Sequence, residues 1–184
     1  MKHKKPLKIT SRTSSVTNGF VQAILPDFPP TAEQRDALFA VLGMNMNNVR
    51  CVYCGDKATD WDHLQPLVKG KRPTGHLTDY RNLVPACGRC NQSKGGHHWR
   101  SWMSGKAVNS PATRGVADLD ARIGILERYE LWASATPIDF AKIVGEARSS
   151  AYWDRLSQIE ALMRDAQEEA AVLRDRISHA VRQR

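Results

Sequence analysis

Apolar and polar positions alternate most regularly near the C-terminal end of the chain. Eight apolar residues there repeat at alternating spacings of three and four: Leu156, Ile159, Met163, Ala166, Ala170, Leu173, Ile177 and Ala180. This pattern is a heptad seam of more than three repeats, and it predicts one long helix with a single apolar side. A shorter stripe predicts another helix over residues 116–132, formed by Val116, Leu119, Ile123 and Leu126.

The N-terminal part of the chain predicts an arm followed by a helical segment. Residues 1–19 are polar, with five Lys or Arg and no acidic residue. We expect a flexible basic arm, which either contacts nucleic acid or serves as a solubilising tail. Within residues 20–49, Thr31 has the character of a helix N-cap and Gly43 that of a helix stop. The apolar positions between them are Ala32, Leu38, Phe39 and Leu42.

The seam of the last helix needs a partner, either the 116–132 helix or a second copy of the chain. From Leu156 to Ala180 it extends about 36 Å, whereas the earlier stripe extends only about 15 Å. Much of the seam would therefore stay uncovered within one chain, and exposed apolar stripes of that length usually mark an interface. We expect a homodimer through residues 116–184, with Leu173 and Ile177 in its interface.

Four cysteines occupy the middle of the chain in two Cys-x-x-Cys pairs, Cys51 with Cys54 and Cys87 with Cys90. This spacing lets each pair hold one edge of a tetrahedral Zn²⁺. Because four thiolates leave no position open for substrate, the predicted zinc is structural. Redox-active dithiols are the competing interpretation. The 32 residues between the pairs are more than a simple zinc ribbon contains, so this insertion is the place to look for chemistry.

The insertion contains ATDWDHLQPLV and KGKRPTGHLTDY, and then runs into RNLVPACGRCNQSKGG. Across residues 51–94 this text resembles the HNH, or ββα-metal, endonuclease family in its four-cysteine form. The signature of that family is DH, an Asn before the second cysteine pair, and CNxxKG. The matching residues are Asp62, His63, Asn82, Asn91 and Lys94. The resemblance implies an α+β fold: a ββα-metal nuclease core over residues 50–104, braced by zinc, with an N-terminal helix and a C-terminal helical extension.

The chemistry of phosphodiester hydrolysis explains these residue types. A neutral imidazole suits a general base that activates water, and His63 takes that role. Asp62 and Asn91 offer oxygen ligands to a hard divalent cation, most simply Mg²⁺, with Mn²⁺ as a substitute. Many members of the family have histidine where this chain has Asn91, and the change favours a hard metal over catalytic zinc.

Two further roles follow from the resemblance and from helical spacing. In the family, the residue that matches Asn82 orients the general base through the local backbone. Lys94 is three residues after Asn91, so both should lie on one side of a helix. We therefore expect Lys94 to contact the scissile phosphate or its neighbour.

Charge points to a polyanionic partner. The net charge is +8, and residues 50–115 hold 11 Lys or Arg against 4 Asp or Glu. Clustered positive charge binds nucleic acid through counterion release. The best candidates to hold the backbone of double-stranded DNA are the loop residues Lys69, Lys71, Arg72 and His76. Trp99 and Trp102 either cap the small core or stack on DNA.

No stretch approaches the roughly 20 apolar residues of a membrane-spanning helix, and no secretory signal opens the chain. We therefore expect a cytoplasmic protein with reduced cysteines. The sequence predicts a metal-dependent DNA endonuclease, specifically a homodimeric type II restriction enzyme. A nicking or homing HNH enzyme is the alternative, as is a non-catalytic zinc-dependent DNA-binding protein. Cleavage of RNA, or a toxin role, also stays open.

Overall fold

The computed structural model describes residues 6–183, which divide into two compact units. One unit is the central stretch Leu25–Ile138, and the other combines the two ends of the chain, up to Ile24 and from Asp139 onward. Helices dominate, together with two small antiparallel sheets, which confirms the predicted α+β class. Within the described residues, no helix has the length and apolar character that crossing a bilayer requires.

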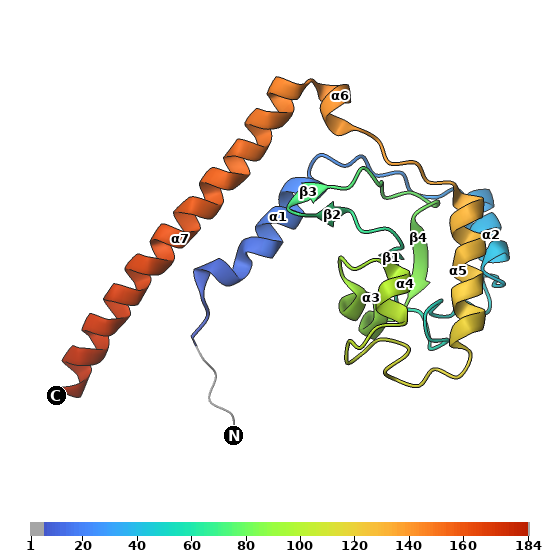
Figure 1. The fold of residues 1–184 in the computed structure, drawn as a ribbon, viewed down its shortest axis with the longest axis horizontal. Helices are drawn as coiled ribbons and strands as arrows, with labels where there is room; N and C mark the ends of the chain where they lie inside the picture. Colours follow the sequence, from blue (N-terminus) through green and yellow to red (C-terminus); the bar gives the residue numbers. More distant parts are fainter. Residues whose placement is uncertain (1–5, 184) are drawn as a thin grey trace. The chain divides into compact units, whose positions relative to one another are not determined.

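A ββα arrangement forms the middle of the central unit (Figure 1). Strand β1 (Asp60–His63) pairs antiparallel with β4 (Leu83–Ala86), with Asp62 opposite Val84. Helix α3 (Gly88–Lys94) begins two residues after β4 and packs against β1. The chain between these strands forms a second hairpin, β2 (Val68–Lys69) with β3 (Arg72–Pro73).

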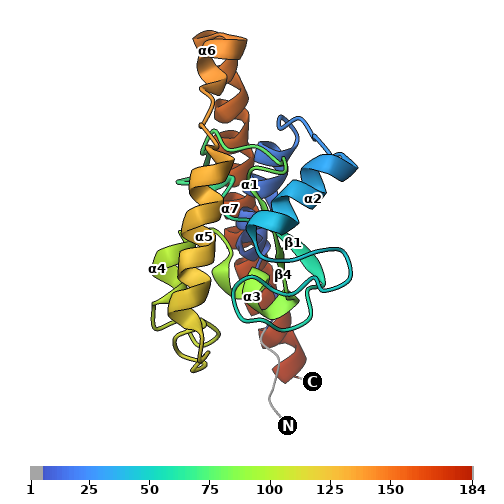
Figure 2. The ribbon, with the colours of Figure 1, turned by 90° about the vertical axis from the view of Figure 1, so that its right-hand side faces the viewer.

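Three more helices cover this arrangement: α2 (Ala32–Val41), α4 (Trp99–Met103) and α5 (Leu119–Ala133). The predicted N-cap is confirmed, because Thr31 and Gln34 form a reciprocal capping box. Helices α2 and α5 lie side by side, and α4 packs against α5 (Figure 2). Their apolar sides meet in one core that includes Leu38, Phe39, Trp99, Trp102 and Leu126 together with three of the cysteines. Trp99 and Trp102 thus serve the core, being 1% and 3% exposed.

The other unit is built on α7 (Glu146–Arg182), an uninterrupted helix of 37 residues preceded by the short α6 (Phe140–Val144). The predicted long C-terminal helix is therefore confirmed. A 3₁₀ turn (Ile9–Arg12) and helix α1 (Thr13–Gln22) pack along α7. Tyr152 donates a hydrogen bond to the main-chain oxygen of Phe20 at 2.9 Å, and their rings lie 5.1 Å apart.

This packing corrects the expected flexible arm over residues 1–19. Its described part from Ile9 onward is helical, whereas residues 1–5, and His3 with them, lie outside the described residues. Covered positions of α1 recur at helical spacing: Thr13, Val16, Thr17, Phe20 and Val21. This stripe is hard to recognise in the sequence because two of its five members are threonines, which are polar residues. Val21 is completely buried, and so its burial stabilises α1 against α7.

The start of the C-terminal seam is buried within its own unit, where α1 packs along α7. Leu156 is 1% exposed in the unit that contains α1, whereas Leu126 of α5 is buried in the core of the central unit. The C-terminal part of the seam is not buried. Leu173 is 52% exposed and Ile177 is 63% exposed.

Candidate active site

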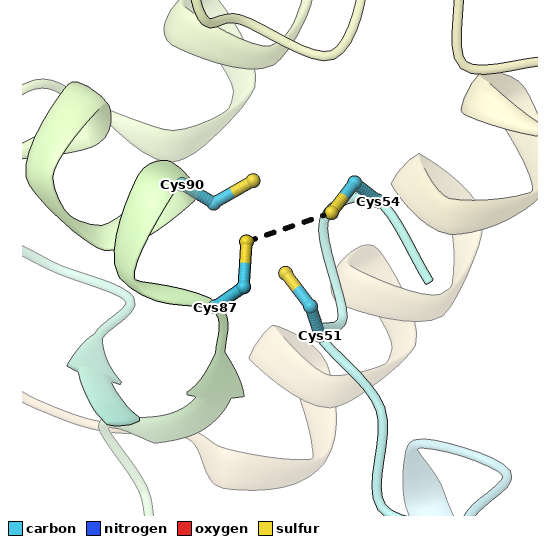
Figure 3. Close-up of side chains that lie close together, drawn as sticks. All are labelled: Cys51, Cys54, Cys87 and Cys90. Atoms are coloured by element: carbon cyan, nitrogen blue, oxygen red, sulfur yellow. Dashed lines mark hydrogen bonds between the residues drawn. The ribbon is translucent and has the colours of Figure 1, made fainter. Parts of the chain in front are cut away.

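The four cysteine sulfurs converge on one point (Figure 3). All four lie within 4.8 Å of one another, and the Sγ atoms of Cys54 and Cys87 are 3.7 Å apart. Sulfurs on a tetrahedral Zn²⁺ with bonds of about 2.3 Å are separated by about 3.8 Å, so the donor set and its spacing fit this ion. A hydrogen bond with Cys51, and then burial, raises the pKa of Cys90. Four neighbouring thiolates would need a cation between them.

Residues beyond the second cysteine pair complete the surroundings of this cluster. Arg114 donates to Cys90 Sγ at 3.4 Å and to the Asp56 carboxylate at 3.1 Å. Arg122 of α5 donates to the main-chain oxygens of Cys51 and Val52, both at 3.4 Å. A Cβ on Gly55 (φ +79°) would lie 2.5 Å from the Arg122 guanidinium, so glycine permits this approach.

His63 is the last residue of β1 and is half-buried. Its Nε2 lies 2.9 Å from Thr78 Oγ1, a hydrogen bond that fixes the ring. Burial, and after it the charge of Lys94, lowers the pKa of His63 to about 4. The imidazole is therefore neutral at physiological pH, which is the form that accepts a proton.

Asp62 points to the opposite side of β1 and is only 5% exposed. Tyr53 donates to its Oδ2 at 2.7 Å, and Lys94 Nζ lies 3.2 Å from the same oxygen. Burial raises the pKa of Asp62 above its ordinary value, although Lys94 and Tyr53 oppose that shift. Two carboxylate oxygens offer about four lone-pair positions, and these two partners do not use all of them.

The position of Lys94 corrects the expected phosphate contact. Its side chain is completely buried, and Nζ donates to the main-chain oxygen of His63 at 2.7 Å. Helical spacing gave the correct side of α3 but not the depth: the side chain extends beneath β1 rather than out to solvent. Burying an ammonium group requires a partner, and Asp62 provides it. Lys94 therefore ties α3 to the two residues of the DH pair.

Asn82 is 1% exposed and bridges two stretches of backbone. Its Oδ1 accepts from the amide of Gln65 at 2.8 Å, while Nδ2 donates to the main-chain oxygens of Gln65 and Leu77, both at 3.1 Å. The main-chain oxygen of Asn82 accepts from Leu64 at 2.8 Å. The residues directly after His63 are thus held by Asn82 on both its side chain and its backbone.

Asn91 lies in the first turns of α3 and is half-buried. Its backbone continues the helix from Cys87, whose main-chain oxygen accepts from the Asn91 amide at 3.0 Å. Cys87 and Cys90 belong to the cysteine cluster, so this cluster also sets where Asn91 stands.

The basic loop divides into two parts. Lys69, Lys71 and Arg72 are exposed on the β2–β3 hairpin, whose turn residues Gly70 and Lys71 both have positive φ, +57° and +63°. His76 is instead half-buried, and its Nδ1 is buried without a hydrogen-bond partner. It lines a cavity of about 510 Å³ together with Gln65, Arg81 and Asn82, among others. Only the hairpin residues thus have the exposure that a backbone contact requires.

Three contributors were missing from the sequence-based site: Tyr53, Thr78 and Tyr129. Tyr53 lies inside the first cysteine pair, so its place there was a possible signal. Thr78 is 15 residues after His63 in an irregular loop, where no periodic pattern exists. Tyr129 contacts a turn more than 40 residues away, which only the folded chain reveals.

Comparison with known proteins agrees with this geometry. Residues 51–105 match the model of the HNH endonuclease family. A CRISPR-associated endonuclease Cas9 from Corynebacterium diphtheriae is 30% identical to the chain over an alignment of 115 residues, and the match covers 59% of this chain and 9% of that protein. The chain thus spans less than a tenth of that relative's length. No solved structure matches.

Proposed function

We propose that the HNH endonuclease domain of residues 51–105 hydrolyses phosphodiester bonds in double-stranded DNA, with His63 as general base. The observation that carries the proposal is the environment of His63. The ring is neutral and hydrogen-bonded to Thr78, and the adjoining backbone is fixed by Asn82. A base held in one orientation needs no reorganisation when water attacks the phosphorus.

Asp62 and Asn91 are the proposed ligands of the catalytic cation, with Mg²⁺ or Mn²⁺ as the ion their oxygens suit. When bound, such a cation stabilises charge on the phosphate oxygens. Tyr53 and Lys94 orient the Asp62 carboxylate for this purpose through the hydrogen bonds described above. Cys51, Cys54, Cys87 and Cys90 hold structural Zn²⁺, which supports the start of α3.

Long DNA substrates, unmodified and cytosine-methylated, test this function directly. Purified protein is incubated with them in Mg²⁺ or Mn²⁺, and the products are separated by size. We expect cleavage into discrete bands, the behaviour of a type II restriction enzyme, which is the finer proposal. A smear would indicate a non-specific nuclease. Retention of DNA without any cleavage would instead support the non-catalytic zinc-dependent DNA-binding protein.

The β2–β3 hairpin is the proposed contact with the DNA backbone. Lys71 adopts a left-handed conformation that a lysine reaches only with strain, and such outliers often mark function. Lys71→Gly should keep or raise the melting temperature, because glycine has no such strain. The same change should weaken DNA binding and lower the slope of log K against log salt by about one unit.

Fluorescence anisotropy over a salt series measures this effect, and Lys106→Gly is the matched control. Lys106 is also exposed, in the loop before α5, so the control removes the same charge elsewhere in the central unit. Equal slopes for the two variants would remove the hairpin from the proposed interface.

We also propose a homodimer through α7, since two sites are needed to cut both strands. Its exposed apolar residues include Leu162, Val172, Leu173, Ile177 and Val181. The double substitution Leu173→Glu and Ile177→Glu should convert a dimer to a monomer in sedimentation, because buried like charges without partners are costly.

Ser178→Glu is the control for this substitution, because Ser178 is exposed beside the seam and the change adds a glutamate without removing an apolar seam residue. A wild-type monomer at tens of micromolar, with single-strand nicks as the final product, would overturn the dimer. That result would favour the nicking alternative.

A further inference from the structure

Helix α5 lies outside residues 51–105, yet its side chains contact the backbone that carries Asn82. Tyr129 is completely buried, and its hydroxyl lies 2.8 Å from the main-chain oxygen of Tyr80 and 2.9 Å from that of Leu83. These two carbonyl groups flank Asn82 on either side. One phenol therefore links the two ends of the turn from Tyr80 to Leu83.

The next residue of α5, Glu130, contacts Gln65, to which the Asn82 side chain binds. Glu130 accepts hydrogen bonds from the side chains of Gln65 and Trp99. Gln65 is the residue whose main-chain amide and carbonyl group both bind the Asn82 side chain. Two consecutive residues of one helix thus contact the turn that carries Asn82 and the residue Gln65 to which its side chain binds.

Aromatic packing gives this contact a fixed geometry. Trp132 lies 5.8 Å from the Tyr129 ring and 5.9 Å from the Tyr80 ring, measured between centroids. Rings at these separations attract one another in a preferred orientation. Burial, and then the charge of Asp79, raises the pKa of Tyr129 well above its ordinary value, so its hydroxyl stays a donor.

We infer that Tyr129 is a positioning residue for DNA cleavage, supported by Glu130, and that α5 is an obligatory part of the nuclease. The inference rests on the proposed function, because Asn82 matters here through the backbone next to His63. The hydroxyl of Tyr129 acts through the turn from Tyr80 to Leu83, whose main-chain oxygens accept its hydrogen bonds. A purely structural phenol would contribute to stability without any selective effect on turnover.

Tyr129→Phe removes the hydroxyl alone, and Tyr152→Phe is its matched control. Tyr152 also donates to a main-chain oxygen, at 2.9 Å from that of Phe20, but in the unit built on α7. We expect Tyr129→Phe to lower kcat by about tenfold or more with KM within about twofold, since small misplacements of catalytic groups are costly. Tyr152→Phe should leave kcat within about twofold while lowering the melting temperature similarly, because each loses one hydrogen bond.

Hydrogen exchange separates this inference from the proposed function, because it requires no cleavage. In Tyr129→Phe, the amides of Leu64, Gln65 and Asn82 should exchange about tenfold faster, as expected when one hydrogen bond of a local unit is lost. Unchanged exchange, or an equal fall in kcat for both phenylalanine variants, would overturn the positioning role. If the wild-type protein is inactive but the variant shows the expected exchange, the proposed DNA cleavage is contradicted, whereas the contact of Tyr129 with the turn that carries Asn82 is not. Should Tyr129→Phe fail to retain zinc, Glu130→Leu replaces it, because leucine removes the acceptor that Gln65 and Trp99 share. Accelerated exchange at Gln65 is then the expected result and unchanged exchange the contrary one.

Discussion

Replacing His63 by alanine is expected to lower the rate of DNA cleavage by about 10² to 10⁴-fold, the usual contribution of a general base. Folding and DNA affinity should be nearly unchanged. The imidazole, at the end of β1, contacts Thr78. The buried contacts of this strand are made instead by Asp62, with Tyr53 and Lys94 as its partners. Single-turnover cleavage in Mg²⁺ measures the rate, and anisotropy without divalent metal measures the affinity.

His97→Ala is the control for this experiment. His97 is exposed and follows α3, so the substitution removes an imidazole close in sequence to the site without altering the base. A His63→Ala variant that keeps more than about a tenth of the wild-type rate would exclude His63 as general base, since that loss falls below the usual range. Equal losses in both histidine variants would indicate a general effect on folding.

The cysteine cluster was predictable because its information is local. Each Cys-x-x-Cys pair places two ligands within one turn of chain, and a four-ligand site needs both pairs, so the two turns must come together. The same holds for the N-cap at Thr31 and for the existence of one helix along the seam from Leu156 to Ala180. In each case the pattern lies within a short stretch of chain, and the structure confirms it.

Depth and long-range partners were not predictable in this way. Spacing placed Lys94 on the same side of a helix as Asn91, but only the packing of α3 against β1 shows that its ammonium group is buried against Asp62. The seam of α7 likewise predicted an apolar partner without identifying it. Threonines in α1 concealed the apolar stripe that packs along α7, so the sequence offered only the 116–132 helix or a second copy of the chain as partners.

The cysteine cluster lies within the core of the central unit, which makes the expected effect of losing the proposed zinc large. Cys51, Cys87 and Cys90 belong to the buried core itself, beside Val84 and Trp102. Zinc-finger peptides gain about 10–16 kcal/mol from Zn²⁺ at neutral pH, whereas whole domains are stable by about 5–15 kcal/mol. Removing one ligand therefore threatens the entire unit.

Cys87→Ser is accordingly expected to abolish tight zinc binding and to unfold the central unit. Cys87 is the N-cap residue of α3, so the start of that helix and Asn91 lose their support together with the metal. Elemental analysis should find one Zn²⁺ per wild-type chain and none in the variant, and tryptophan fluorescence should report exposure of Trp99 and Trp102. Since the four cysteines are the whole complement of the chain, the control is wild-type protein stripped by a chelator and reloaded with zinc. Reloading should restore its native fluorescence, whereas the variant should stay unfolded in excess zinc. Active wild-type protein without any bound zinc would contradict the structural role of the metal.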